Sequence, residues 1–94
     1  MQNFHEETDS GVCVIDFWAA WCGPCKMMSP VIDELAEDMP DVKVYKVNVD
    51  QEERLASAFG VMSIPTIALM RDGQVVSTVV GYKTKDALLG QLGL

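Results

Sequence analysis

Two cysteines, Cys22 and Cys25, are the residues of this chain best suited to chemistry, because only two residues separate them. Side chains three positions apart on a helix are neighbours, so this pair can close into a disulfide and open again without moving the backbone. The free N–H groups and the dipole at a helix N-terminus stabilise a thiolate and lower its pKa. We therefore expect thiol–disulfide exchange. Cys22, at a helix start, attacks, and Cys25, one turn later and more buried, resolves the mixed disulfide.

Gly23 and Pro24, the residues between the cysteines, are expected to tune this pair. Proline is compatible with the first turn of a helix, where its missing N–H costs nothing, and it makes that turn stiffer. A histidine at one of these positions would supply a cation that stabilises the thiolate and favours an oxidant. Because neither position holds a histidine, the sequence favours a reductant.

The composition narrows the class of protein and its location. The 94 residues are enough for one domain, predicted to span residues 1–94, and the net charge of −7 argues against nucleic acid as a partner. No segment approaches the roughly 20 apolar residues that cross a bilayer. The N-terminus is acidic and polar, unlike a secretory signal peptide. We therefore expect a cytoplasmic protein without membrane association, in a compartment that keeps thiols reduced.

Two other uses of the cysteines fit less well. A purely structural disulfide is unusual in a reducing compartment. A zinc site needs four ligands, and the sequence offers only His5, Cys13, Cys22 and Cys25. Cys13 lies within a predicted strand, where we expect it to be a small core residue. No metal site is therefore expected.

The elements predicted around the cysteines alternate between strands and helices. The apolar patterns predict strands over residues 12–18, 42–48, 66–71 and 74–80, and helices over residues 22–38, 51–59 and from Thr84 onward. A further short helix fits residues 3–9. Asp72 and Gly73 have the composition of a hairpin turn. A strand–helix–strand unit makes its two strands parallel, so these elements predict an α/β domain with a mixed sheet.

The region around the cysteine pair resembles the thioredoxin family. The stretch Phe-Trp-Ala-Ala-Trp-Cys-Gly-Pro-Cys-Lys at residues 17–26 is similar to the active-site signature of that family. Further matches follow in order at residues 46–50 (Lys-Val-Asn-Val-Asp), at residues 64–66 (Ile-Pro-Thr), at Asp72-Gly73 and at Gly81. Together the matches span about residues 12–92, which is most of the chain.

This resemblance implies a thioredoxin-like fold, with a mixed central sheet of about four strands flanked by helices. It also implies a protein disulfide reductase that holds no cofactor, acts on disulfide-containing proteins and is recycled by a thioredoxin reductase drawing on NADPH. Two other functions remain open from the sequence. One is a docking scaffold whose redox chemistry is incidental, and the other is a disulfide oxidase or isomerase.

The resemblance also implies roles for two charged residues. Asp16 occupies the place of a buried carboxylate behind the resolving cysteine, and it is the only charge in its predicted strand. Desolvation should raise the pKa of Asp16 and let it exchange a proton with Cys25. Lys46 matches a lysine near that carboxylate. The alternatives are an ordinary strand-end carboxylate and a solvated strand lysine.

Pro65 matches a cis-proline that faces the active-site cysteines in the family. The backbone at Ser63 and Ile64 would then pair with an extended segment of the target protein. The neighbouring pair Met62 and Ser63 is expected to influence which partners dock, and Trp18 is expected to pack beneath the site. The docking surface would comprise Trp21, Gly23, Pro24, Ile64, Pro65, Gly81 and Tyr82.

The sequence departs from the family at its beginning. Family members usually open with an additional strand, whereas only 11 residues precede the strand predicted over residues 12–18. We therefore expect the first strand of the family fold to be missing and the strand over residues 42–48 to be an open edge. Lys43 and Lys46 would protect that edge. The consequence is either lower stability, with the chain a monomer, or a dimer through the 42–48 edge strand.

Overall fold

The structure, a computed structural model, describes residues 4–94. The elements are, in chain order, α1 (Phe4–Thr8), β1 (Val12–Trp18), α2 (Gly23–Asp38), β2 (Lys43–Asn48), α3 (Glu53–Ala58), β3 (Thr66–Arg71), β4 (Gln74–Val80) and α4 (Lys85–Leu92). Every predicted element is therefore confirmed, with bounds that differ by no more than two residues. The short helix expected over residues 3–9 is found as α1, and Asn3 lies outside the described residues.

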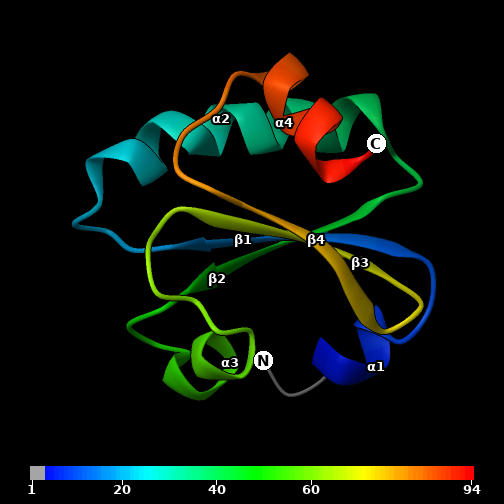
Figure 1. Ribbon diagram of the computed structural model, residues 1–94, viewed down its shortest axis with the longest axis horizontal. Helices are drawn as coiled ribbons and strands as arrows, with labels where there is room; N and C mark the ends of the chain where they lie inside the picture. Colours follow the sequence, from blue (N-terminus) through cyan, green and yellow to red (C-terminus); the bar gives the residue numbers. More distant parts are fainter. Residues whose placement is uncertain (1–3) are drawn as a thin grey trace.

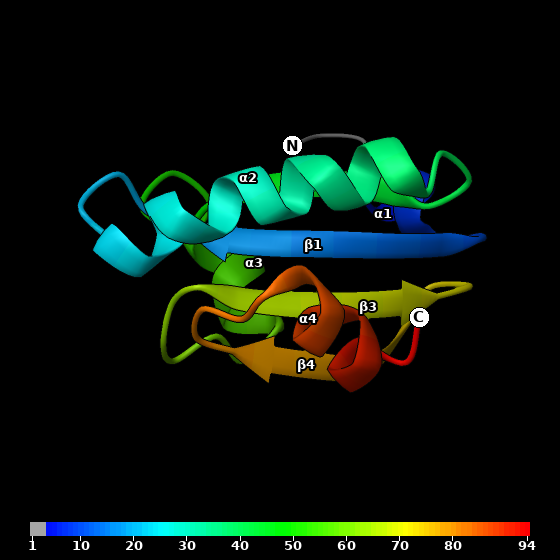
Figure 2. The same ribbon diagram turned by 90° about the horizontal axis from the view of Figure 1, so that it is seen from above.

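The strands form one mixed sheet in the order β2-β1-β3-β4. β1 is parallel to β2 and antiparallel to β3, and β3 and β4 form the expected antiparallel hairpin. Helices α2 and α4 cover one face of the sheet, and α1 and α3 cover the other (Figures 1 and 2). The predicted α/β architecture with four strands is therefore confirmed for the described part of the chain.

The central strand β1 is buried on both faces of the sheet. Successive side chains of a strand point to opposite faces. Val14 accordingly packs with the residues of α2 and α4, whereas Cys13 and Ile15 pack into the cluster on the side of α1 and α3. Cys13 is fully buried and is the core residue that the sequence predicts. This alternation places Asp16 on the same face as Val14, beneath α2.

Strand β2 is an edge strand in the described structure, as expected, because it pairs with β1 alone. The Lys43 ammonium at its start donates hydrogen bonds to the carbonyl oxygens of Glu7, at 2.8 Å, and Ser10, at 3.2 Å. These bonds connect β2 to the segment that leads from α1 into β1. None of the helices formed by residues 4–94 is long and apolar enough to span a bilayer.

Candidate active site

Cys22 lies at the N-terminus of α2, where it is the N-cap residue in an extended conformation. Its Sγ accepts a hydrogen bond of 3.2 Å from the backbone N–H of Cys25. Pro24 lies in the first turn of the helix, where its missing N–H is not needed. The predicted helix start is therefore one residue early, and Cys22 caps α2 instead of forming its first residue.

Cys22 and Cys25 form a disulfide, with their Cα atoms 5.2 Å apart. This separation is within the range that a disulfide requires, so the pair needs no backbone movement to close. The two residues are equally buried, at 4% and 3% exposed. The expectation that Cys25 is the more buried of the two is therefore not met in the oxidised form, because both sulfurs share one small apolar cluster with Ala19.

The loop before β3 brings a second segment against the cysteines. The Sγ of Cys22 lies 3.8 Å from the carbonyl oxygen of Ile64. The Ile64–Pro65 peptide bond is cis, as the resemblance implies. The carbonyl of Pro65 accepts a 2.8 Å hydrogen bond from the N–H of Gly81, which follows β4. Gly81 has a φ of 90°, a conformation that favours glycine.

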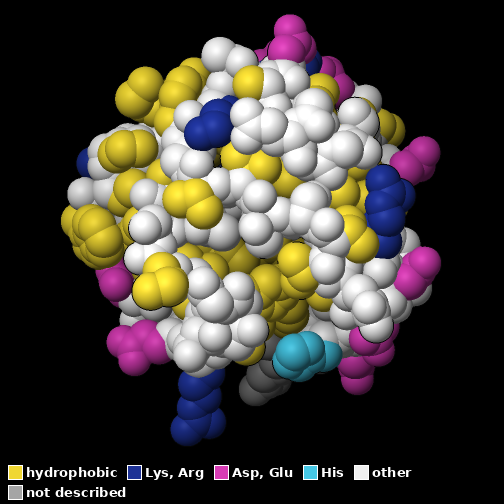
Figure 3. Space-filling view, viewed as in Figure 1, with side chains coloured by type: hydrophobic (Ala, Val, Ile, Leu, Met, Phe, Trp, Pro, Cys, Tyr) yellow, Lys and Arg dark blue, Asp and Glu magenta, His cyan; other side chains and the backbone are white. Residues whose placement is uncertain are grey.

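A groove of about 400 Å³ opens beside the disulfide. Trp21 and Met62 on its rim are 70% and 96% exposed. The indole N–H of Trp21 donates a 2.8 Å hydrogen bond to the carboxylate of Asp50. In Figure 3 apolar side chains gather on the left, where Figure 1 places the start of α2 and the loop before it. The groove is lined by Trp21, Val49, Ala56, Val61, Met62, Ser63 and Ile64.

The predicted docking residues do not all lie in this groove. Trp21 and Ile64 line it, and Pro65 follows Ile64 directly but is buried. Gly81 contacts Pro65 through its backbone, and Tyr82, which follows it, is exposed. Asp50 is the partner that sequence reasoning missed. It lies in a stretch that matches the family, but nothing in that stretch indicates a contact with Trp21.

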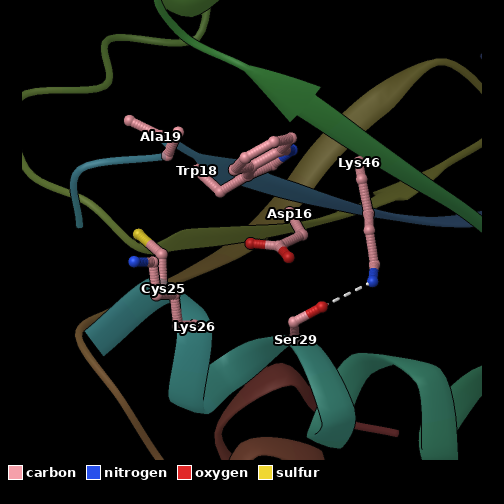
Figure 4. Close-up of a pocket in the computed structure, with 8 residues that line it drawn as sticks. Asp16, Trp18, Ala19, Cys25, Lys26, Ser29 and Lys46 are labelled. Carbon is pink, nitrogen blue, oxygen red and sulfur yellow. Dashed lines mark hydrogen bonds between the residues drawn. The ribbon is translucent and has the colours of Figure 1, made fainter. Parts of the chain in front are cut away.

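Asp16 lies beneath the disulfide in a cavity of about 530 Å³. The residue is 1% exposed, and its Oδ1 has no hydrogen-bond partner in the described structure. Burial raises the pKa of Asp16 to about 6, which Lys46 partly opposes and Asp33 reinforces. The expected direction of this shift is confirmed. Figure 4 shows the cavity, which is lined by Asp16, Trp18, Ala19, Ala20, Cys25, Lys26, Ser29 and Lys46.

Lys46 lies beside Asp16 but forms its ion pair elsewhere. The two residues are register partners on β1 and β2 and line the same cavity. The ammonium of Lys46, however, lies 2.7 Å from the Oγ of Ser29 and 2.7 Å from the carboxylate of Asp33, both on α2. Lys46 lies near Asp16, as the resemblance implies, whereas no sequence pattern indicates its two partners on α2.

The ligands considered for a zinc site are not brought together. Cys13 packs on the face of the sheet that α1 and α3 cover, and α2, which carries Cys25, lies on the other. Among residues 4–94, no three histidine, cysteine, aspartate or glutamate residues are grouped so that they could hold a metal ion.

A family model described as thioredoxin matches residues 1–93 of the chain. The chain belongs to the thioredoxin family. It is 52% identical to the thioredoxin of Bacillus subtilis strain 168 over 88 residues, which are 93% of this chain and 85% of that protein. It is 45% identical to the thioredoxin of Listeria monocytogenes over 86 residues, which are 90% of this chain and 84% of that protein.

Solved thioredoxin structures share the fold. The thioredoxin of Malassezia sympodialis superposes with a TM-score of 0.89 at 37% identity, over 98% of this chain and 84% of that one. A mutant thioredoxin of Halobacterium salinarum superposes with a TM-score of 0.86 at 40% identity, over 100% of this chain and 87% of that one.

As a thioredoxin, the chain is a thiol–disulfide oxidoreductase that reduces protein disulfides. Its redox-active disulfide is Cys22–Cys25, through which it transfers electrons. Membership of the family implies, in general terms, a reductase that returns the pair to the dithiol and target proteins that carry disulfides.

Proposed function

We propose that Cys22 is the nucleophile, that Cys25 resolves the mixed disulfide and that Asp16 exchanges a proton with Cys25. The observation that carries this assignment is the position of the Cys22 Sγ, which caps α2, accepts the Cys25 N–H and lies beside the Ile64 carbonyl. A helix N-terminus stabilises an anion, which supports Cys22 as the thiolate that attacks first.

The reaction has two exchange steps that balance in electrons and protons. The Cys22 thiolate attacks one sulfur of the target disulfide, and the other target sulfur leaves as a thiolate and takes up a proton. Asp16 then accepts the proton of the Cys25 thiol. The Cys25 thiolate attacks the sulfur of Cys22, and the second target sulfur leaves and is protonated. The target has gained two electrons and two protons, and Cys22–Cys25 is oxidised.

The groove beside Cys22 is proposed to hold the target. An extended target segment would pair with the backbone at Ser63 and Ile64, as in strand addition. Trp21 and Ile64 line the groove, and exposed apolar surface of this kind is typical of a docking site. The remaining members of the proposed surface are Gly23, Pro24, Pro65, Gly81 and Tyr82.

The partners are proposed from family membership. The chain would act as a single domain in the cytoplasm, hold no cofactor of its own, and receive two electrons from a thioredoxin reductase that uses NADPH and carries the flavin. It would work as a monomer, with the β2 edge as the surface through which a second copy could pair. Lys43 and Lys46 on this edge support the monomer, because charged residues oppose pairing of edge strands.

Trapping tests the assignment of the two cysteines. The Cys25→Ser variant should accumulate targets linked to Cys22 from a lysate, because the second exchange step is blocked. The Cys22→Ser variant should trap nothing and should reduce no test disulfide. Cys13→Ala is the matched control and should behave like the unaltered chain. A scaffold with incidental redox chemistry would keep its binding partners in the Cys22→Ser variant, and that outcome would overturn the proposal.

A further inference from the structure

The position of the Lys46 ammonium is unexpected for a residue beside a buried carboxylate. Lys46 and Asp16 are register partners on adjacent strands, and both line the same cavity. Adjacent strands lie roughly 4.8 Å apart, and the flexible four-carbon stem of lysine spans that separation easily. The ammonium nevertheless points to α2, where Figure 4 shows its hydrogen bond to Ser29.

Ser29 and Asp33 are placed to hold this ammonium together. They are four residues apart on α2, a spacing that puts two side chains on the same face of a helix. Each lies 2.7 Å from the Lys46 ammonium. The Asp16 Oδ1, by contrast, has no hydrogen-bond partner in the described structure. Lys46, Ser29 and Asp33 therefore connect β2 to α2. This connection does not include the buried carboxylate.

We propose that Ser29 and Asp33 are positioning residues that hold the Lys46 ammonium away from Asp16, and thereby keep Asp16 able to accept the proton of Cys25. This inference rests on the proton-exchange role proposed above for Asp16. An ammonium in direct contact with a buried carboxylate stabilises its charged form and makes it a weaker base. An ammonium held on α2 provides only part of that stabilisation.

The other described groups around Asp16 do not supply a cation that could take the place of Lys46. From α2 the cavity is lined by Cys25, Lys26 and Ser29, and from β2 by Lys46. The register partner of Asp16 on β3 is the uncharged Ile67. Lys26 is exposed, so solvent screens its charge. Lys46 is therefore the cation whose position matters most, and its position is set by Ser29 and Asp33.

The first test measures the pKa of the Asp16 carboxyl by NMR titration in the oxidised protein, where Cys22 and Cys25 do not titrate. Ser29→Ala removes one contact without changing the charge, and Asp33→Asn removes the ion pair. Each should lower the pKa of Asp16, by about one unit if Lys46 then reaches the carboxylate. Glu37→Gln, which removes a charge one turn further along α2, is the matched control and should leave the pKa unchanged.

A second variant separates positioning from a direct charge effect. In a Lys46→Met background, Ser29→Ala should no longer shift the pKa of Asp16, and Asp33→Asn should retain only the small effect of its own charge. If Ser29→Ala leaves the pKa unchanged when Lys46 is present, the positioning proposal is overturned. The same holds if the shift persists without Lys46.

The rate of target release distinguishes this proposal from the one on which it rests. In single-turnover experiments, the acid limb of the pH profile for release should move to lower pH in Ser29→Ala, by the same amount as the pKa of Asp16. A lowered pKa with an unchanged release profile would support the positioning of Lys46 and overturn the proton-exchange role of Asp16.

Discussion

The indole N–H of Trp21 is held by the carboxylate of Asp50, at 2.8 Å, although the Trp21 side chain is 70% exposed. Trp21 directly precedes Cys22, and Asp50 follows β2, so the bond connects two loops at the same end of the sheet. An aromatic ring fixed in this way can contact a partner without first losing its own rotational freedom. The bond would therefore favour docking of a target segment at the rim of the groove, as proposed above.

Removal of the Asp50 side chain should weaken target binding more than it slows the exchange reaction. In Asp50→Ala the ring of Trp21 is no longer held, and KM for a disulfide-containing target protein should rise by about twofold to tenfold, with kcat little changed. Asp50→Asn keeps an acceptor oxygen and should restore most of the lost affinity. Steady-state kinetics with a protein target measure both values, and a fall in kcat alone would contradict this role.

Asp16 should make the stability of the protein depend on pH. Burial raises its pKa from 3.8 to about 6, so the folded state binds the proton more tightly than the unfolded state. The cost of the buried charge is therefore small near pH 4, grows as the pH rises from 4 to 6, and is complete above pH 6. The free energy of unfolding therefore decreases as the pH rises from 4 to 6.

The Asp16→Asn variant avoids this cost, because asparagine carries no charge. Its free energy of unfolding should exceed that of the unaltered chain by about 1–3 kcal/mol at pH 7 and by much less at pH 4. Urea unfolding of the oxidised protein at the two pH values measures the difference. Asp41→Asn, at an exposed turn position, is the control and should not alter the pH dependence. An equal gain at both pH values would show that packing, not charge, is responsible.

The Cys13 thiol should not react with alkylating reagents or take part in disulfide exchange in the folded protein. It is fully buried, and burial raises the pKa of its thiol, an effect that Lys43 opposes only in part. An alkylating reagent should label Cys22 in the reduced native protein and label Cys13 only after unfolding, as mass spectrometry can determine. Cys13→Ala should cost about 1 kcal/mol of stability and leave the rate of disulfide exchange unchanged. Rapid labelling of Cys13 at neutral pH would contradict this assignment.

The β2 edge should pair with a second copy of the chain when its positive charge is reduced. Lys43→Thr removes an exposed ammonium and its bonds to the carbonyls of Glu7 and Ser10. Unpaired N–H and C=O groups of the edge are then less protected, so a concentration-dependent dimer is expected in sedimentation experiments. Lys83→Thr changes a lysine outside the strands and should remain monomeric. A Lys43→Thr variant that stays monomeric at high concentration would show that this lysine does not guard the edge.

Much of the fold and of the site could be predicted from local patterns. The burial of Asp16 followed from a single charge in an apolar strand, and the helix start followed, to within one residue, from the sequence around Pro24. These predictions succeed because strand alternation and helix geometry act over a few residues. The similar burial of Cys22 and Cys25 did not follow, because it depends on residues packed over the pair from other parts of the chain.

By itself, then, the sequence determined the redox pair, the order of strands and helices, and the family of the chain. The tertiary structure alone decided which side chains meet across elements: Trp21 with Asp50, Cys22 with the Ile64 carbonyl, and Lys46 with Asp33 instead of Asp16. Lys46 is long enough to reach either carboxylate, and it pairs with Asp33 because the packing of α2 on β2 places Asp33 and Ser29 together at its ammonium. Which carboxylate Lys46 pairs with depends on distances between elements. These distances cannot be predicted from a local pattern of residues.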